Sequence, residues 1–520
     1  MAVYPYFVLG PNAALSLAGL TKGRDRTTPT PAEDWRQARV DVVIPAFNEA
    51  DTIVFCLASL MRQTLRPRRV ILVDDGSTDG TLDSARAFCE QNDFELIAIQ
   101  RRKPIGKTPT IKRQAREFDS DVEFILDGDT VLESPNYIER AVQELYQGVG
   151  IASACGTILP LRRRDRLSLA AEPSVRAFAA TPGMAQPARE EPILTGLLRG
   201  VTNVYREVLY LFLQRFIYRG QMEFFGSITN PVGCAVAYRR KYVEALFDLV
   251  SPRLGDDLTN SEDIFIGMGM LNEGYRNIQL SDVYARTVEP PCNRLFRQVY
   301  LWSSSFLQSC FYYNDLLRSP LHVFKRSRAR QQRVAENRAP AAATRVEFAG
   351  AGALGPISPG MTPLLRTTVP TPRSLTSMPE SVPMPADLHD LANMPTSGNA
   401  ERRRVAEAYR QPFGRDYTRR IGRPVGWLLA AAAVEKVFFP TALLIMLLLG
   451  QWEAFWVTVA CESLIGLTAL VLVTKGHRLE YFFKGLAVIP VRYMLLCAEF
   501  VTLGRFAVDL WITRNRKWRK

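Results

Sequence analysis

The 520-residue chain has only eight cysteines, and their arrangement excludes one kind of site. No two of them are separated by two residues and no regular spacing relates them, which argues against structural zinc. The same pattern is typical of a protein in a reducing compartment. The cysteines lie at positions 56, 89, 155, 234, 292, 310, 461 and 497.

The chain also lacks a stripe of basic residues interleaved with aromatics, although its formal net charge is +13. This absence argues against nucleic acid as a partner. Much of the positive excess lies in short runs near expected membrane contacts, so an anionic lipid surface is the predicted partner. These runs are residues 162–164, 325–333, 402–404 and the C-terminus.

Two segments match an ion-binding motif only in part. Gly106-Lys107-Thr108 ends like a phosphate loop, but position 101 is Arg where a Walker A motif needs Gly. Lys107 can still contact a diphosphate at a helix start, or it can belong to a solvated basic helix. Asp75 begins a calcium-like loop whose twelfth position is Arg86 instead of Glu, which excludes an EF-hand.

Long apolar runs are confined to the C-terminal part of the chain. Residues 425–449 and 452–474 each exceed the roughly 20 residues that a bilayer requires, and are predicted membrane spans. Residues 479–512 are apolar with spaced charges, which suits an interfacial helix or a third span. Basic clusters before, between and after these runs favour an even number of crossings. A hairpin plus an interfacial helix is therefore predicted over 425–512, in the inner or plasma membrane with the catalytic domain cytoplasmic.

Two further segments stand apart by composition. Residues 1–26 form an apolar segment broken by proline, which suits a short anchor, a surface-lying segment or a span. Residues 326–418 are rich in Pro, Ala, Ser, Thr and Arg with few aromatics, which predicts a disordered linker.

Between these segments, residues 40–130 alternate short apolar runs with helical patterns. The runs at 40–44, 70–73 and 124–126 are predicted strands, and 50–62, 81–91 and 107–118 are predicted helices. This rhythm predicts an α/β domain with a parallel sheet covered by helices.

Three acidic clusters follow or precede apolar runs of this domain. Asp74-Asp75 and Asp127-Gly128-Asp129 each follow a predicted strand, where open α/β sheets bind ligands. Asp127 and Asp129 are candidate ligands of a hard divalent cation that completes its shell with phosphates. Ser261-Glu262-Asp263 opens an apolar helix and taken alone suits a helix N-terminus. The alternatives for the first two clusters are a polar helix-capping turn and a tight Asp-Gly turn.

In order, these clusters resemble the signature of family-2 glycosyltransferases with a Rossmann-like GT-A fold. The likeness covers about residues 40–302 and includes residues 45–49, the segment 230–235 and Gln298 with Trp302. It is closest to the membrane-bound processive polysaccharide synthases of hyaluronan, chitin and cellulose. The resemblance implies a GT-A domain over 38–302, a UDP-sugar donor, Mg²⁺ or Mn²⁺, and inversion at the anomeric carbon.

The resemblance also implies roles for individual residues. Asp263 would be the general base, Asp127 and Asp129 would hold the metal, and Lys107 would meet the nucleotide. The remaining donor and acceptor contacts would come from Glu49, Asp74, Asp75, Asp127, Glu262, Gln298 and Trp302.

One position departs from the family pattern. Where the family has Gln-x-x-Arg-Trp, position 301 is Leu, so Arg294 or Arg297 is the candidate contact to the diphosphate. The expected acceptor is a growing polysaccharide; the alternative is transfer of one sugar to a lipid, which Leu301 and the small membrane part favour. Segments 194–219 and 303–320 are candidate interfacial helices against membrane lipids, with ordinary core helices as the alternative. An oligomer is left open.

Overall fold

The computed structural model describes residues 34–147, 150–182, 192–254, 261–328, 331, 414–474 and 476–513, together with 13, 14 and 17. The predicted N-terminal segment and the predicted linker lie almost entirely outside the described residues. The chain divides into two units, Met1–Pro320 with Thr396–Lys520, and Leu321–Pro395. The sheet and the helices that cover it belong to the first unit.

Eight strands form one mixed sheet in the order β3-β2-β1-β4-β7-β6-β8-β5 within the described residues. The first four strands are parallel. β1, β2 and β4 are apolar runs whose residues are largely buried, as both faces of a parallel sheet require, whereas β3 at the edge is only partly buried. β7 is antiparallel to both β4 and β6 and thereby joins the two halves of the sheet. The strands are β1 Val40–Ala46, β2 Arg69–Asp74, β3 Ile97–Gln100, β4 Val122–Leu126, β5 Thr130–Leu132, β6 Ile151–Pro160, β7 Ala235–Arg239 and β8 Arg276–Thr287.

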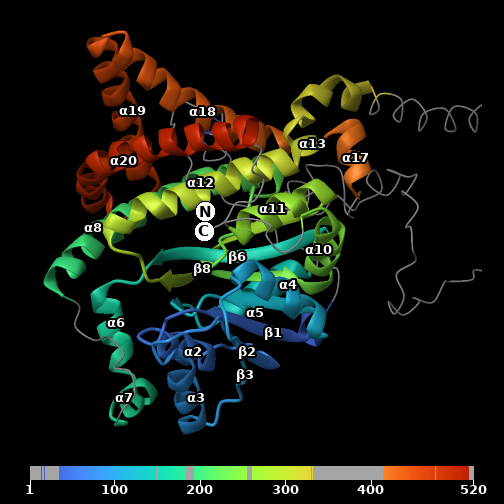
Figure 1. The fold of residues 1–520 in the computed structure, drawn as a ribbon, viewed down its shortest axis with the longest axis vertical. Helices are drawn as coiled ribbons and strands as arrows, with labels where there is room; N and C mark the ends of the chain where they lie inside the picture. Colours follow the sequence, from blue (N-terminus) through green and yellow to red (C-terminus); the bar gives the residue numbers. More distant parts are fainter. Residues whose placement is uncertain are drawn as a thin grey trace, which may run out of the picture. The chain divides into compact units, whose positions relative to one another are not determined.

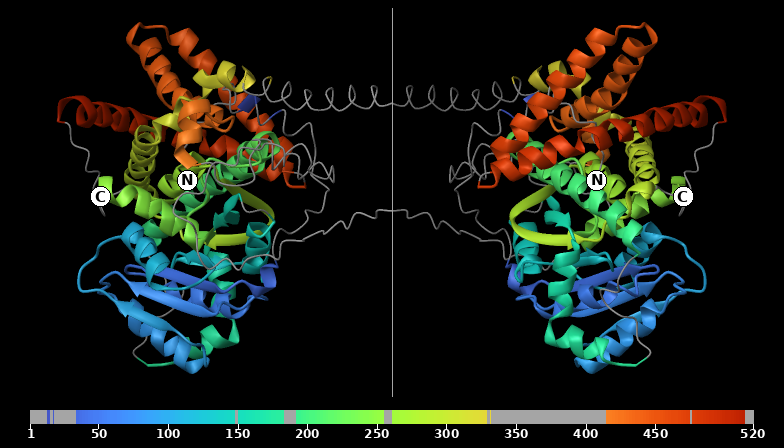
Figure 2. Two further views of the ribbon diagram at one scale, coloured as in Figure 1. Left: turned by 90° about the vertical axis from the view of Figure 1, so that its right-hand side faces the viewer. Right: turned by 90° about the vertical axis from the view of Figure 1, so that its left-hand side faces the viewer.

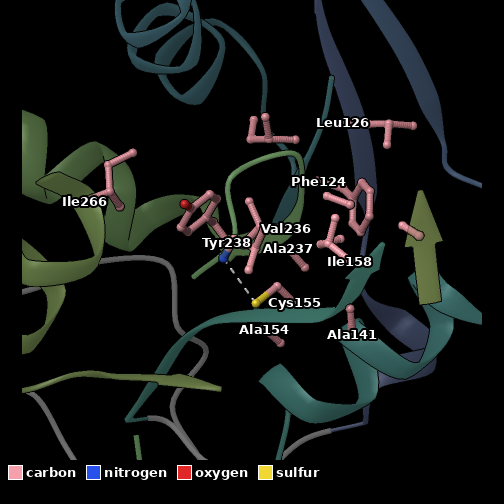
Figure 3. Packing of buried hydrophobic residues seen from close by; sticks show 14 of the residues in the cluster. Phe124, Leu126, Ala141, Ala154, Cys155, Ile158, Val236, Ala237, Tyr238 and Ile266 are labelled. Atoms are coloured by element: carbon pink, nitrogen blue, oxygen red, sulfur yellow. Dashed lines mark hydrogen bonds between the residues drawn. The ribbon is translucent and has the colours of Figure 1, made fainter. Parts of the chain in front are cut away.

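Helices follow the strands of the first half as the sequence predicts. Close packing at the centre of the sheet is visible in Figure 3, where Phe124 of β4, Ile158 of β6 and Val236 of β7 are all buried. The ring of Phe124 meets the Tyr137 ring edge-on with centroids 5.9 Å apart, which ties α5 to β4. The helices of this part are α2 Ile53–Met61, α3 Thr81–Gln91, α4 Lys107–Glu117, α5 Tyr137–Leu145, α6 Arg163–Ala170, α7 Pro173–Ala179, α10 Arg240–Leu254 and α11 Glu262–Glu273.

A second group of helices packs on the sheet and on the C-terminal part. α8 contacts β6, α19 and α20, while α12 lies between α11 and α20 (Figure 1). α20, red in Figure 2, contacts both α8 and α12. These helices are α8 Ile193–Phe212, α9 Arg219–Phe225, α12 Leu295–Tyr312, α13 Asn314–Leu317, α17 Gly414–Ile421, α18 Gly426–Leu448, α19 Trp452–Val473 and α20 Arg478–Ala507.

Among the helices that the structure describes, α18, α19 and α20 are long and apolar enough to cross a membrane. The charges that suggested an interfacial helix at 479–512 are largely paired with other elements. Lys484 pairs with Glu207 of α8, Arg492 with Glu462 of α19, and Glu499 with Lys436 of α18. Pairing removes part of the cost of these charges in an apolar setting, so α20 is a candidate span. Whether it crosses or lies in the interface stays a prediction.

The two candidate interfacial helices differ in exposure. The first two turns of α8 expose apolar side chains, with Ile193 84% and Leu197 64% accessible, whereas α8 is largely buried from Tyr205 onward. α12 is buried continuously from Ser303 to Cys310. The start of α8 therefore has the surface that a lipid-facing segment needs, and α12 has the burial of a core helix. The interfacial assignment of 303–320 stays a prediction.

Candidate functional site

The first two acidic clusters lie at one edge of the sheet because the strands before them are parallel and in register. Ala46 at the end of β1 is opposite Asp74 at the end of β2, and the Asp75 backbone N–H donates to Ala46 O at 2.9 Å. β4 pairs with the other side of β1 and ends at Leu126, directly before Asp127. The sequence prediction that these carboxylates share one edge agrees with this topology.

Lys107 connects the second and third clusters. From the start of α4, its Nζ lies 2.6 Å from Asp127 Oδ1 and 2.7 Å from Glu262 Oε1, and it donates to Gly233 O at 3.1 Å. Burial lowers the pKa of Lys107, but the carboxylates of Asp127 and Glu262 outweigh burial and hold that pKa well above its usual value. The charged ammonium of Lys107 therefore holds Asp127, Glu262 and Gly233 together. Lys107 and Gly233 are 126 residues apart in the sequence.

Three carboxylates gather around Gly128. Gly128 stands between Asp127 and Asp129 in the sequence. A Cβ at Gly128 would lie 2.0 Å from Glu49 Oε2, so the Glu49 side chain lies directly against this glycine. Burial raises the pKa of Glu49 well above its usual value, and the charges of Asp129 and Asp127 raise it further. Burial also raises the pKa of Asp127 to about 7, against the opposing effect of Lys107. A cation placed among these groups would relieve this repulsion.

The donor set fits a hard divalent cation that keeps ligands from elsewhere. Within the described ranges no group of three His, Cys, Asp or Glu side chains is arranged to hold a metal. Mg²⁺ and Mn²⁺ sites built from one or two carboxylates plus substrate phosphates need no such group. Asp129 supplies a fixed carboxylate, since its Oδ1 accepts from Thr130 Oγ1 and Thr287 Oγ1, both at 3.2 Å.

For the sugar transfer from a UDP-sugar that the resemblance to family-2 glycosyltransferases implies, we expect Gly128→Ala to be inactive while the protein stays folded. The added methyl group would displace the Glu49 carboxylate or push apart Asp127 and Asp129, since 2.0 Å is far inside van der Waals contact. UDP affinity measured with and without Mn²⁺ should show weaker metal-dependent binding. The matched control is Gly80→Ala, where a Cβ meets nothing within 4 Å, although its φ of +86° makes some loss of stability unavoidable. Full activity of Gly128→Ala would contradict this geometry.

The two aspartates of the first cluster have different surroundings. Asp75 accepts from the backbone N–H groups of Ile105 and Gly106 at 3.0 and 2.7 Å, and it pairs with Arg101 at 2.9 Å. It therefore fixes the turn that precedes Lys107. Asp74 Oδ1 accepts from the Ser77 backbone N–H at 3.2 Å, while its buried Oδ2 has no hydrogen-bond partner within the described residues. A nucleoside contact from either carboxylate stays a prediction.

Asp263 lies on the first turn of α11, against the 230–235 segment. Its Oδ2 accepts from the Gly233 backbone N–H at 3.3 Å, and its Oδ1 accepts from Ser261 Oγ at 2.5 Å and from the Ile264 N–H at 2.8 Å. A Cβ at Gly233 would lie 2.8 Å from Asp263 Cβ. The glycine thus permits the close approach of segment 230–235 to the start of α11, two segments that both belong to the family resemblance.

Gln298 and Trp302 meet an arginine that the sequence analysis did not name. Arg206 of α8 is completely buried, donates from Nη2 to Gln298 Oε1 at 2.6 Å, and stacks over the Trp302 ring at 4.4 Å. Its Nε lies 3.5 Å from Glu289 Oε2, just after β8. The neighbouring Val288 N–H donates to Asp129 O at 3.2 Å, so this group adjoins the second acidic cluster.

Arg294 and Arg297, the sequence candidates for the diphosphate, are both exposed, so their assignment stays a prediction. A periodic signal for Arg206 was present in the sequence. Thr202, Tyr205, Arg206 and Leu209 recur at helical spacing on a face that is buried. An arginine on an apolar helix face requires an anionic or polar partner, which marks it as a candidate.

Residues 41–247 match the family model described as glycosyl transferase family 2. The chain is 32% identical over 96 residues to a cholesterol galactosyltransferase of Borreliella burgdorferi, covering 18% of this chain and 26% of that protein. It is 30% identical over 116 residues to an undecaprenyl-phosphate 4-deoxy-4-formamido-L-arabinose transferase of Serratia proteamaculans, covering 22% and 35%. It is 26% identical over 101 residues to a poly-beta-1,6-N-acetyl-D-glucosamine synthase of Staphylococcus aureus, covering 19% and 24%.

The chain thus spans about a quarter to a third of the length of these curated relatives. A mannosyltransferase of Pyrobaculum calidifontis, solved with GDP-Man and Mn²⁺, aligns with 57% of this chain and 74% of its own at 18% identity and a TM-score of 0.37. The family match and the sheet topology together confirm the predicted GT-A class of α/β fold.

Proposed function

We propose that the protein moves a sugar from a UDP-sugar to the hydroxyl of a growing polysaccharide at a membrane. The chain belongs to glycosyltransferase family 2 through residues 41–247, which match the family model. One observation carries the proposal. Lys107 bridges Asp127 and Glu262. The carboxylates suited to a metal ion with its bound diphosphate, and the start of α11 with the candidate base Asp263, therefore form one site.

The residues of this site support an inverting displacement. Asp263, held by Gly233 and Ser261, would take the proton from the acceptor hydroxyl as its oxygen attacks the anomeric carbon. The bond from that carbon to the diphosphate breaks, and UDP leaves. A Mg²⁺ or Mn²⁺ ion held by Asp127 and Asp129 would supply positive charge to the departing diphosphate. Lys107 keeps a second positive charge beside Asp127.

Transfer of a single sugar to a lipid is the second candidate. Two relatives have lipid acceptors in their names, cholesterol and undecaprenyl phosphate, while a third is a polysaccharide synthase. Three helices long and apolar enough to cross a membrane suit either acceptor. The half-buried Trp302, stacked on Arg206 beside Gln298, supports the polysaccharide because an aromatic ring offers a face for a sugar.

The test is UDP release by the purified full-length chain in detergent or vesicles, with a panel of UDP-sugars and with Mn²⁺ or Mg²⁺. Products are then separated by size. A ladder or long polymer supports the synthase, and a single organic-soluble product supports the lipid alternative. Absence of transfer and of UDP release with every donor would refute the proposed function.

Arg206 is the arginine whose loss we expect to cost most near the Gln298–Trp302 pair. A charge-assisted hydrogen bond is worth roughly 1.5–3 kcal/mol, so Arg206→Met should lower kcat/KM by about tenfold to a hundredfold. Arg294→Ala and Arg297→Ala are matched controls that remove exposed guanidinium groups from the same region. Steady-state kinetics and melting temperature are measured for all three.

The opposite ranking would favour the exposed arginines as the diphosphate contact. A large loss in Arg294→Ala or Arg297→Ala with a nearly normal Arg206→Met would do so. In that case Leu301→Arg, which restores the family residue, should partly rescue the affected variant.

A further inference from the structure

A buried ion pair joins two of the C-terminal helices to the catalytic domain. Lys436 Nζ of α18 lies 2.8 Å from Glu499 Oε2 of α20, and both side chains are at most 3% exposed. Ser303 of α12 completes the cluster, since its Oγ donates to Glu499 Oε1 at 2.6 Å and accepts from Lys436 Nζ at 2.8 Å. Three helices from distant parts of the chain therefore meet at one polar point.

α12 carries this cluster within three residues of two parts of the candidate site. Trp302, which stacks on Arg206, directly precedes Ser303. Ser305, fully buried, donates from Oγ to the backbone carbonyl of Ser261 at 3.1 Å. Ser261 in turn donates to Asp263 Oδ1. A shift of α12 would therefore move both Trp302 and the segment that holds the candidate base.

Stability alone is a weak reason for such a pair. Burying two charges costs several kcal/mol per ion, and apolar replacements of similar volume are often neutral or stabilising. Charges within apolar helices of candidate membrane spans are expensive for the same reason, and their presence there is a sign of function. The ion pair differs from a purely apolar contact because hydrogen bonds are directional. Its hydrogen bonds to Ser303 fix both the distance and the orientation of that side chain.

We propose that Lys436, Glu499 and Ser303 are positioning residues that set α12, and through it Trp302 and Asp263, for transfer to the acceptor. This inference rests on the proposed function and deepens it. The C-terminal helices then contribute to catalysis as well as to anchoring. Loss of the cluster should reduce turnover and leave the donor site formed by Asp127, Lys107 and Glu262 intact.

The experiment replaces the pair by apolar residues of similar size in the full-length chain, Lys436→Met/Glu499→Leu. The matched control is Glu462→Leu/Arg492→Met, which removes another ion pair between candidate spans, from α19 to α20. We expect kcat of the first variant to fall about tenfold at unchanged donor KM and a similar melting temperature. The control should keep its kcat. Ser303→Ala, which keeps both charges, should give a smaller loss of kcat. Ser303→Thr, which keeps a hydroxyl group, should retain the wild-type kcat.

A readout independent of chemistry separates this inference from the proposed function. Backbone hydrogen exchange of peptides covering 261–265 and 300–306 should speed up in Lys436→Met/Glu499→Leu and in Ser303→Ala, and stay unchanged in the control. If exchange and kcat of both α12-cluster variants match wild type, the positioning role is refuted. If wild type itself transfers no sugar while exchange responds as expected, the proposed function fails and the mechanical link remains.

Discussion

Asp129→Ala should reduce sugar transfer by at least about a thousandfold, because metal-ion stabilisation of developing charge is worth several kcal/mol. Asp129 is held by hydrogen bonds from Thr130 and Thr287, which favour its ionised form, whereas burial raises its pKa, so a nearby cation would stabilise the carboxylate further. Wild-type UDP affinity should fall when Mn²⁺ is removed with a chelator. The affinity of the variant should already be low and should not respond to the chelator.

Two comparisons keep this prediction specific. Asp282→Ala removes an exposed carboxylate of β8 that pairs with Arg140, and it should keep wild-type kinetics. Asp129→Asn retains a carbonyl oxygen that can accept from both threonines, so a folded but inactive Asp129→Asn assigns the loss to charge. Unchanged UDP release by folded Asp129→Ala would remove Asp129 from the metal site.

The first half of the sheet could be predicted from the sequence because its information is local. The runs before Asp74 and Asp127 are short, apolar and bounded by turn residues, and they become β2 and β4. The second half could not be predicted in the same way. β7 runs antiparallel to β4 through pairs such as Leu126 with Ala235, more than 100 residues apart, and no local pattern specifies that partner.

The candidate site divides along the same line. Asp127, Asp129 and Asp263 could be proposed from the sequence because each belongs to a short motif. Arg206 and Glu289 were missed because their significance arises only when α8 and the end of β8 meet Gln298. A motif search reads neighbours in sequence, whereas a buried charge acquires its role from neighbours in space.

The C-terminal helices illustrate a different limit. Lys484, Arg492 and Glu499 suggested an interfacial helix because charges spaced along an apolar run usually face water. Their partners, Glu207, Glu462 and Lys436, lie on three other helices. Such pairing is a property of packing, so the composition of 479–512 alone could not distinguish an interfacial helix from a candidate span.

Asp263→Asn tests the chemical step more directly than any other single change. General base catalysis contributes typically 10²–10⁴ in rate, so kcat should fall by about that factor. The amide oxygen can still accept from Ser261 and Ile264, but the amide nitrogen would face the Gly233 N–H and lose one long hydrogen bond. Donor binding should survive, because the groups that surround Lys107 are unchanged.

The neighbouring acid provides the decisive comparison. Glu262→Gln keeps the shape of the side chain but removes one of the two carboxylates that hold Lys107, so it should weaken UDP binding and spare kcat at saturating donor. Both variants are measured for UDP affinity and for kcat. Equal loss of affinity and kcat in Asp263→Asn would indicate that Asp263 organises the loop at Gly233. A large loss of kcat in Glu262→Gln, with Asp263→Asn nearly active, would make Glu262 the base, since its carboxylate also lies against Gly233 and is 2.7 Å from Lys107.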